Sequence, residues 1–310
     1  MVRAGPDGDG QAARLYQRIL ARAGNRSLAA AINEDARAAA ALGPGMGVVL
    51  VPGLFYRSHP QTFGNGTFLK RSVRSLAERC HTVPLEGSEG PELAATRINE
   101  ALRSAFPGDS LLLVSLSKGS AEVRCALSRP EAGEAFRRVK AWISISGLPF
   151  GTPAFDQAMA HPLRAAALRA YCRATGRKLS LVGELLRHRP GTRVALPAHL
   201  QLYQVVAFPT VRRVRGVLAR LFQPDLSPYG PSDGYAPIEE LLALPGYIYP
   251  LWGADHWLGG VRDLHERMAR LIGIVLGRTV PDQGRVSRTP VMRDDARWPA
   301  IGTASPGSPP

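Results

Sequence analysis

Short apolar runs alternate with segments of helical periodicity from residue 46 onward, and this alternation constrains the fold more than any other feature of the chain. Between the runs, apolar residues recur at helical spacing from Leu93 to Phe106 and from Val261 to Val275, and both stripes are expected to be buried against the sheet. Strands that alternate with helices are typical of βαβ units, so the sequence predicts an α/β fold with a mostly parallel central sheet flanked by helices. The predicted strands cover residues 46–51, 80–85, 110–116, 139–146, 200–208 and 246–252.

Composition divides the chain into three parts. Residues 1–45 are rich in Ala and Arg and predict one or two helices before the first strand. The α/β domain is expected to span 46–278 with a helical cap inserted at about 154–199, because the roughly 50 residues between the fourth and fifth strands are too many for an ordinary connection. Residues 279–310 are rich in Pro, Gly and Arg without periodicity, which predicts a disordered tail.

The net charge of +14 is concentrated in residues 161–222, which hold twelve basic side chains and one acidic one. A solvated surface built from Arg explains this charge, while attraction of an anionic substrate or a membrane surface stays open and nucleic acid is a weaker possibility. The three cysteines are too far apart for a disulfide framework or a CxxC metal site. Because the chain has neither an apolar run of membrane-spanning length nor an amino-terminal secretion signal, a cytoplasmic location is expected.

Ser117 follows a buried strand directly and precedes a helix, in the run from Leu111 to Glu122. A tight turn of this kind exposes a serine hydroxyl above the sheet, and small residues two positions before and after the serine let strand and helix approach closely. Ser115 and Gly119 occupy these positions, so the first residue departs from the usual Gly-x-Ser-x-Gly pattern. The alternative interpretation is that Ser117 only caps the helix.

A serine nucleophile needs a base, and the base needs an orienting carboxylate, because a neutral hydroxyl reacts poorly at pH 7. His256 follows the last predicted strand and is therefore expected at the same sheet edge as Ser117. Asp233 lies in a turn with Gly and Pro before that strand, and it is the preferred acid. Three weaker alternatives for the acid are Asp225, Asp255 and Glu239.

Four motifs, in order along the chain, resemble those of α/β-hydrolases of the lipase and esterase type. They are VPGLF at 51–55, the turn at Ser117, GLPFGTP at 147–153, and the acid and histidine loops at 232–234 and 255–256. The resemblance covers about residues 46–278. It implies Ser117 as nucleophile, His256 as general base and Asp233 as its orienting acid. It also implies an oxyanion hole formed by the backbone N–H groups of Leu54 and Lys118.

The resemblance implies a serine hydrolase that cleaves a carboxylic ester or thioester through an acyl-enzyme, with no cofactor and no metal. Phe55, Tyr56 and Trp257 flank the expected mouth, where aromatic side chains would line an apolar acyl pocket, although simple packing also explains them. The alternative function is a non-catalytic protein of hydrolase fold that binds an anionic membrane surface or nucleic acid through its Arg-rich segment. The retained Ser, Asp and His argue against this alternative.

Overall fold

The centre of the molecule is a six-stranded parallel sheet with the strand order β2-β1-β3-β4-β5-β6. The computed structural model describes residues 10–34, 45–54, 56, 64–72, 78–85, 89–174, 178–189, 194–209, 225–259, 261 and 263–277 of the chain. The strands are β1 (Met46–Val51), β2 (Cys80–Thr82), β3 (Ser110–Leu116), β4 (Val139–Ile145), β5 (Gln201–Phe208) and β6 (Tyr247–Trp252). All six predicted strands are present.

The second strand is shorter than its apolar run. β2 pairs with β1 only from Cys80 to Thr82, whereas the prediction extended to Leu85. Val83 still donates its backbone N–H to the Leu50 carbonyl at 2.9 Å, and both Val83 and Leu85 are fully buried. The apolar run therefore continues as core beyond the point where the strand ladder ends.

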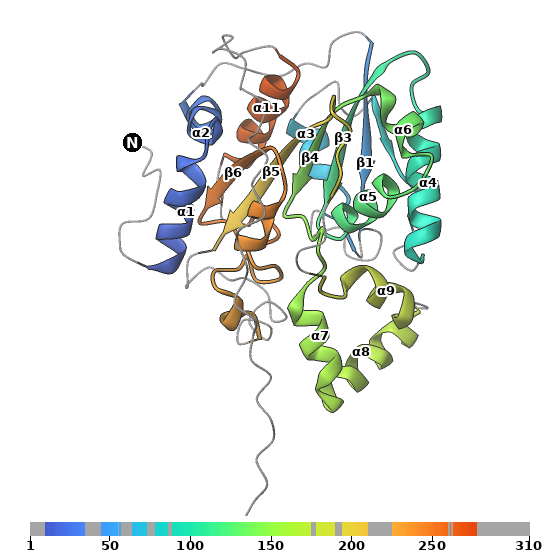
Figure 1. Cartoon of the computed structure of the whole chain (residues 1–310), viewed down its shortest axis with the longest axis vertical. Helices are drawn as coiled ribbons and strands as arrows, with labels where there is room; N and C mark the ends of the chain where they lie inside the picture. Colours follow the sequence, from blue (N-terminus) through green and yellow to red (C-terminus); the bar gives the residue numbers. More distant parts are fainter. Residues whose placement is uncertain are drawn as a thin grey trace, which may run out of the picture. The chain divides into compact units, whose positions relative to one another are not determined.

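Helices cover both faces of the sheet, which is why the inner strands are apolar along nearly their whole length. On one face lie α2 (Asn25–Glu34), α3 (Thr67–Ser72) and α11 (Leu264–Val275), and on the other lie α4 (Pro91–Ser104), α5 (Gly119–Leu127) and α6 (Ala132–Ala135). Figure 1 shows α2 and α11 on one side of the sheet and α4, α5 and α6 on the other. Successive strand residues serve opposite faces: Leu112 packs in the first core and Leu113 in the second.

The two helical stripes predicted from the sequence correspond to α4 and α11. In α4, Ile98 and Leu102 are fully buried against the sheet, as expected. Leu93 is 48% exposed, so its assignment to the buried stripe was wrong. In the first turn of α4 the neighbouring Ala94 takes the buried position, which turns Leu93 toward solvent.

Two amino-terminal helices precede β1, as predicted. α1 (Gln11–Ala21) packs Tyr16 and Ile19 against the β5–β6 end of the sheet. Asn25 at the start of α2 donates to the Ile19 carbonyl and accepts the backbone N–H of Ile248 in β6, each at 2.9 Å. The Asn25 side chain thus satisfies a backbone group on a strand that has a sheet neighbour on one side only.

Three helices occupy the long interval between β4 and β5: α7 (Pro153–Ala160), α8 (Pro162–Ala174) and α9 (Leu179–Leu186). α8 contacts both α7 and α9, and α9 also contacts α4 and α5 on the flank of the sheet (Figure 1). The Thr152 hydroxyl, just before α7, donates to the Tyr235 carbonyl, and His188 after α9 is hydrogen-bonded to Glu240 at 2.7 Å.

The predicted tail, 279–310, lies outside the described residues. Every helix in the described part of the chain is too short or too polar to cross a membrane.

The amino end of β3 and β4 is closed by arginine side chains. Arg138 directly precedes β4, and its guanidinium donates to five backbone carbonyls at the end of α4 and in the connection to β3. These carbonyls belong to Leu102, Arg103, Ala105, Phe106 and Asp109. Arg79 donates to the Met46 carbonyl at 2.9 Å and forms an ion pair with Asp109. Carbonyls that the end of α4 leaves unpaired are thereby satisfied.

Candidate active site

Ser117 lies in the tight turn that links β3 to α5. Its backbone is in the left-handed region, with φ of 50°, where a residue with a side chain is strained. The turn is held by the Ser117 N–H, which donates to the Ile145 carbonyl at 3.0 Å. A Cβ atom at Gly119 would approach the carbonyl oxygens of Val51 and Pro52 within 2.9 Å, so glycine is what allows α5 to begin so close to β1.

Three side chains predicted from the sequence form one chain of hydrogen bonds. Ser117 Oγ lies 2.8 Å from His256 Nε2, and His256 Nδ1 lies 2.6 Å from Asp233 Oδ2. All three residues are buried. The second carboxylate oxygen, Asp233 Oδ1, accepts the N–H groups of Tyr235 at 2.9 Å and Ala236 at 2.8 Å. With Nδ1–H donated to a fixed carboxylate, Nε2 is left as the acceptor that faces the serine hydroxyl.

The three alternative acids are engaged elsewhere. Asp225 forms an ion pair with Arg164, and Glu239 forms one with Arg18. Asp255 accepts two backbone N–H groups from its own turn, at 3.1 and 2.9 Å. Of the acids considered from the sequence, Asp233 is the one that the structure brings to the histidine.

The backbone N–H groups of Leu54 and Lys118 are the ones predicted to form the oxyanion hole. In the part of the chain that the structure describes, no acceptor binds either group. Gly53 anchors the first of them, because its N–H donates to the Gly64 carbonyl at 2.9 Å and a Cβ added to it would lie 3.5 Å from the Ser117 Cβ.

The side chain of Lys118 is engaged in an ion pair with Glu122. Lys118 and Glu122 are fully buried and form an ion pair one helical turn apart in α5. Burial raises the pKa of Glu122, and the charge of Lys118 opposes that shift. The Lys118 ammonium group is held in this pair, so a role of Lys118 in an oxyanion hole would fall to its backbone N–H.

A row of hydroxyl groups, here called the serine thread, runs beneath the turn. Ser115 Oγ accepts the Trp142 indole N–H at 2.7 Å and is hydrogen-bonded to Ser120 Oγ at 2.8 Å. Ser120 Oγ is in turn 2.9 Å from Ser144 Oγ. Ser115 is the residue that departs from the usual Gly-x-Ser-x-Gly pattern. Besides being small, it accepts a hydrogen bond from a buried indole N–H, which glycine could not do.

A small pocket of about 20 Å³ opens beside Ser117. It is lined by Gly64, Phe68, Leu116, Ser117, Ile145, Ser146, His256, Trp257 and Leu258. Trp257 lines the pocket, Tyr56 is half-buried and is not among these residues, and Phe55 lies outside the described residues. Contact of these aromatic side chains with an acyl chain stays a prediction. The Tyr235 ring packs on His256 with centroids 4.6 Å apart, and burial raises the pKa of Tyr235 to about 12.

Sequence reasoning missed Ser146. It follows β4 directly, as Ser117 follows β3, and its backbone is also left-handed, with φ of 44°. Its hydroxyl is buried and has no hydrogen-bond partner within the described structure. The predicted strand 139–146 included Ser146, whereas β4 ends at Ile145, so its place directly after the strand came from the structure.

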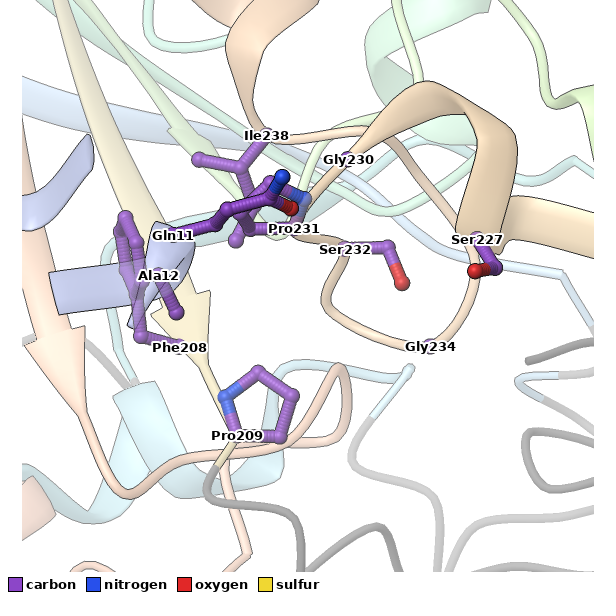
Figure 2. Close-up of a pocket in the computed structure, with 10 residues that line it drawn as sticks. All are labelled: Gln11, Ala12, Phe208, Pro209, Ser227, Gly230, Pro231, Ser232, Gly234 and Ile238. Carbon is purple, nitrogen blue, oxygen red and sulfur yellow. The ribbon is translucent and has the colours of Figure 1, made fainter. Parts of the chain in front are cut away.

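A larger cavity of about 260 Å³ is lined in part by Ser232 and Gly234, the neighbours of Asp233 in its loop. Figure 2 shows Gln11 and Ala12 of α1 on one side of it, with Ser232 and Gly234 of that loop on another. None of the three hydrogen-bonded residues Ser117, Asp233 and His256 lines this cavity. Within the described residues, no cluster of His, Cys, Asp and Glu could hold a metal ion.

Neither protein-family models nor curated protein sequences match the chain. Among solved structures, a metagenomic carboxyl esterase is similar with a TM-score of 0.53 and 20% sequence identity, over 89% of this chain and 92% of that one. The Bacillus licheniformis lipase in its propeptide form is similar with a TM-score of 0.51 and 14% identity, over 79% of this chain and 53% of the lipase. The chain has the α/β-hydrolase fold, in the form found in esterases and lipases.

Proposed function

We propose that this protein is a serine hydrolase that cleaves a carboxylic ester or thioester. The observation that carries the proposal is the unbroken chain of hydrogen bonds from Ser117 Oγ through His256 to Asp233. The similarity of the fold to a carboxyl esterase and a lipase agrees with it.

In the first half of the reaction, Ser117 Oγ attacks the carbonyl carbon of the substrate while its proton passes to His256 Nε2. The imidazolium that forms is stabilised by the Asp233 carboxylate, which is itself held by two backbone N–H groups. The tetrahedral intermediate then expels the alkoxide or thiolate, which takes the proton from Nε2. The products of this half are the free alcohol or thiol and an acyl ester on Ser117.

The negative oxygen of the intermediate would be bound by the N–H groups of Leu54 and Lys118. Donors positioned in advance need little reorganisation when charge develops, and the Gly53 N–H bond to the Gly64 carbonyl holds the residue before Leu54. In the second half, His256 Nε2 takes a proton from water as the water oxygen attacks the acyl carbon. Ser117 leaves with that proton, and the carboxylic acid is released.

A fluorophosphonate probe tests the proposal directly, because it labels an activated serine and ignores one that is merely exposed. The wild type should be labelled at Ser117, and Ser117→Ala should not be labelled. Label that persists in Ser117→Ala would remove the assignment of the nucleophile. A graded series of p-nitrophenyl esters and acyl-CoAs then separates ester from thioester hydrolysis and sets the acyl chain length.

A further inference from the structure

Ser146 combines two unfavourable features at one position beside the candidate nucleophile. Its left-handed backbone is strained for any residue with a side chain, and glycine would adopt it without that strain. Its hydroxyl is buried, with the residue only 3% exposed, and lacks the hydrogen-bond partner that buried hydroxyls nearly always have. Because this strained residue lines the pocket and its hydroxyl has no partner in the described structure, the hydroxyl is placed to bind a group that enters the pocket.

The sheet order fixes the flank on which Ser146 lies. β3 has β1 on one side and β4 on the other, and the register pairs Leu116 of β3 with Ile145 of β4. Ser146 therefore follows β4 at the level of Ser117, at the roughly 5 Å spacing of neighbouring strands. Leu54 follows β1 and lies on the opposite flank.

This arrangement separates the parts of a bound ester. In the proposed mechanism the carbonyl oxygen is bound by the N–H groups of Leu54 and Lys118, and the leaving-group oxygen takes its proton from His256 Nε2. The remaining substituent of the carbonyl carbon is the acyl chain, which is directed away from β1 and toward the β4 flank. The part of the substrate that reaches Ser146 Oγ is therefore the start of the acyl chain.

We propose that Ser146 is a specificity-determining residue whose hydroxyl donates a hydrogen bond to an oxygen atom in the acyl chain, close to the scissile carbonyl. The preferred substrates are then esters or thioesters of short oxygenated acids, with an ether, hydroxyl or keto oxygen one or two carbons from the carbonyl. This inference rests on the proposed function, because it needs a substrate acylated on Ser117. A site that holds an unpaired hydroxyl discriminates against a chain that cannot pair with it.

The test compares p-nitrophenyl methoxyacetate with p-nitrophenyl butyrate, which have the same chain length and differ by one oxygen in place of a methylene. The measured quantity is the ratio of kcat/KM for the two esters in the wild type divided by the same ratio in Ser146→Ala. Dividing the ratios cancels the intrinsic reactivity of each ester. We expect the preference for methoxyacetate to fall about five- to tenfold in Ser146→Ala.

Two further variants control for folding and for the loss of a serine as such. Ser146→Gly also removes the hydroxyl but relieves the backbone strain, so it should lose the same preference while its melting temperature equals or exceeds that of Ser146→Ala. Ser110→Ala makes the same change at the opposite end of β3 and should keep the wild-type ratio. A Ser146→Gly variant that keeps the preference would overturn the proposal.

The alcohol side of the substrate provides the second arm. Butyl acetate and 2-methoxyethyl acetate differ by the same replacement in the leaving group, and their ratio should not change in Ser146→Ala. A change confined to this pair overturns the acyl-chain assignment, and so does an equal fall in kcat/KM for all four esters, which would mean that Ser146 orders water. A wild type that hydrolyses none of the esters overturns the proposed function together with this inference.

Discussion

The two ends of the sheet differ in whether their hydrogen-bonding groups have partners. At the amino end of β3 and β4, Arg138 saturates five carbonyls and Arg79 binds a sixth backbone carbonyl and a carboxylate. At the carboxyl end, the N–H groups of Leu54 and Lys118 and the hydroxyl of Ser146 have no acceptor or partner within the described residues. The paired groups at the amino end support stability, and under the proposed function the unpaired groups at the carboxyl end are the ones that would bind the substrate.

The largest effect should come from the open end. Ser117→Ala and His256→Ala should each lower kcat by several orders of magnitude, on the order of 10⁴ to 10⁶, because the nucleophile and its base act as a unit. Their melting temperatures should stay close to that of the wild type, which thermal unfolding would check. A kcat within about tenfold of the wild type in either variant would contradict the assigned roles.

Asp233→Asn should lower kcat by roughly 10³ to 10⁴, because an amide misorients the imidazole and does not stabilise its cation. The matched control is Asp225→Asn, which removes a carboxylate paired with Arg164 and should change kcat only slightly. Steady-state kinetics on one p-nitrophenyl ester compares the two. If Asp225→Asn is the more damaging change, the acid is misassigned.

At the amino end of the sheet, we expect the reverse: a substitution should lower stability and leave activity unchanged. Arg138→Met leaves carbonyls at the end of α4 without their donor and should lower the free energy of unfolding by about 2 to 3 kcal/mol. Its kcat should remain that of the wild type. Arg137→Met is the matched control, since the neighbouring Arg137 is exposed, and urea unfolding of both variants measures the difference. Equal stability of the two variants would refute the role given to Arg138.

The smallest effect is expected in the serine thread, the saturated layer directly beneath the open groups. Ser115→Ala removes the acceptor of the buried Trp142 N–H and should destabilise the fold by about 1 to 2 kcal/mol. The effect on kcat should be small beside that of Asp233→Asn, because within the described structure the hydrogen bonds of the thread's hydroxyl groups join them to one another and to Trp142, not to the side chains of Ser117, His256 or Asp233. A loss of activity as large as that of Asp233→Asn would show that the serine thread and the hydrogen-bonded chain from Ser117 to Asp233 do not act independently.

The sequence predicted the strands and the three side chains that meet at the sheet edge, for one physical reason. The carboxyl ends of parallel strands share an edge, so residues that follow strands, such as Ser117 and His256, are brought together whatever their separation in the chain. Their catalytic roles, the oxyanion hole and the domain boundaries stay predictions.

Features that depend on distant side-chain partners were not predictable in this way. Arg138 reaches carbonyls about thirty positions earlier, and Trp142 donates to Ser115 across two strands. Neither pairing leaves a periodic or local signature in the sequence. Ser146 was counted as the last residue of the predicted strand 139–146, and its missing partner appears only when its surroundings in three dimensions are known.

The serine thread also constrains how this sequence can change over time. Replacing Ser115 by the glycine usual at such turns would relieve no strain, since the positive φ belongs to Ser117, and it would strand a buried indole N–H. The same replacement made after Trp142→Phe would strand no donor at that position. The two substitutions are therefore epistatic, and a lineage can move from the serine form of the turn to the glycine form more easily when the tryptophan is exchanged first.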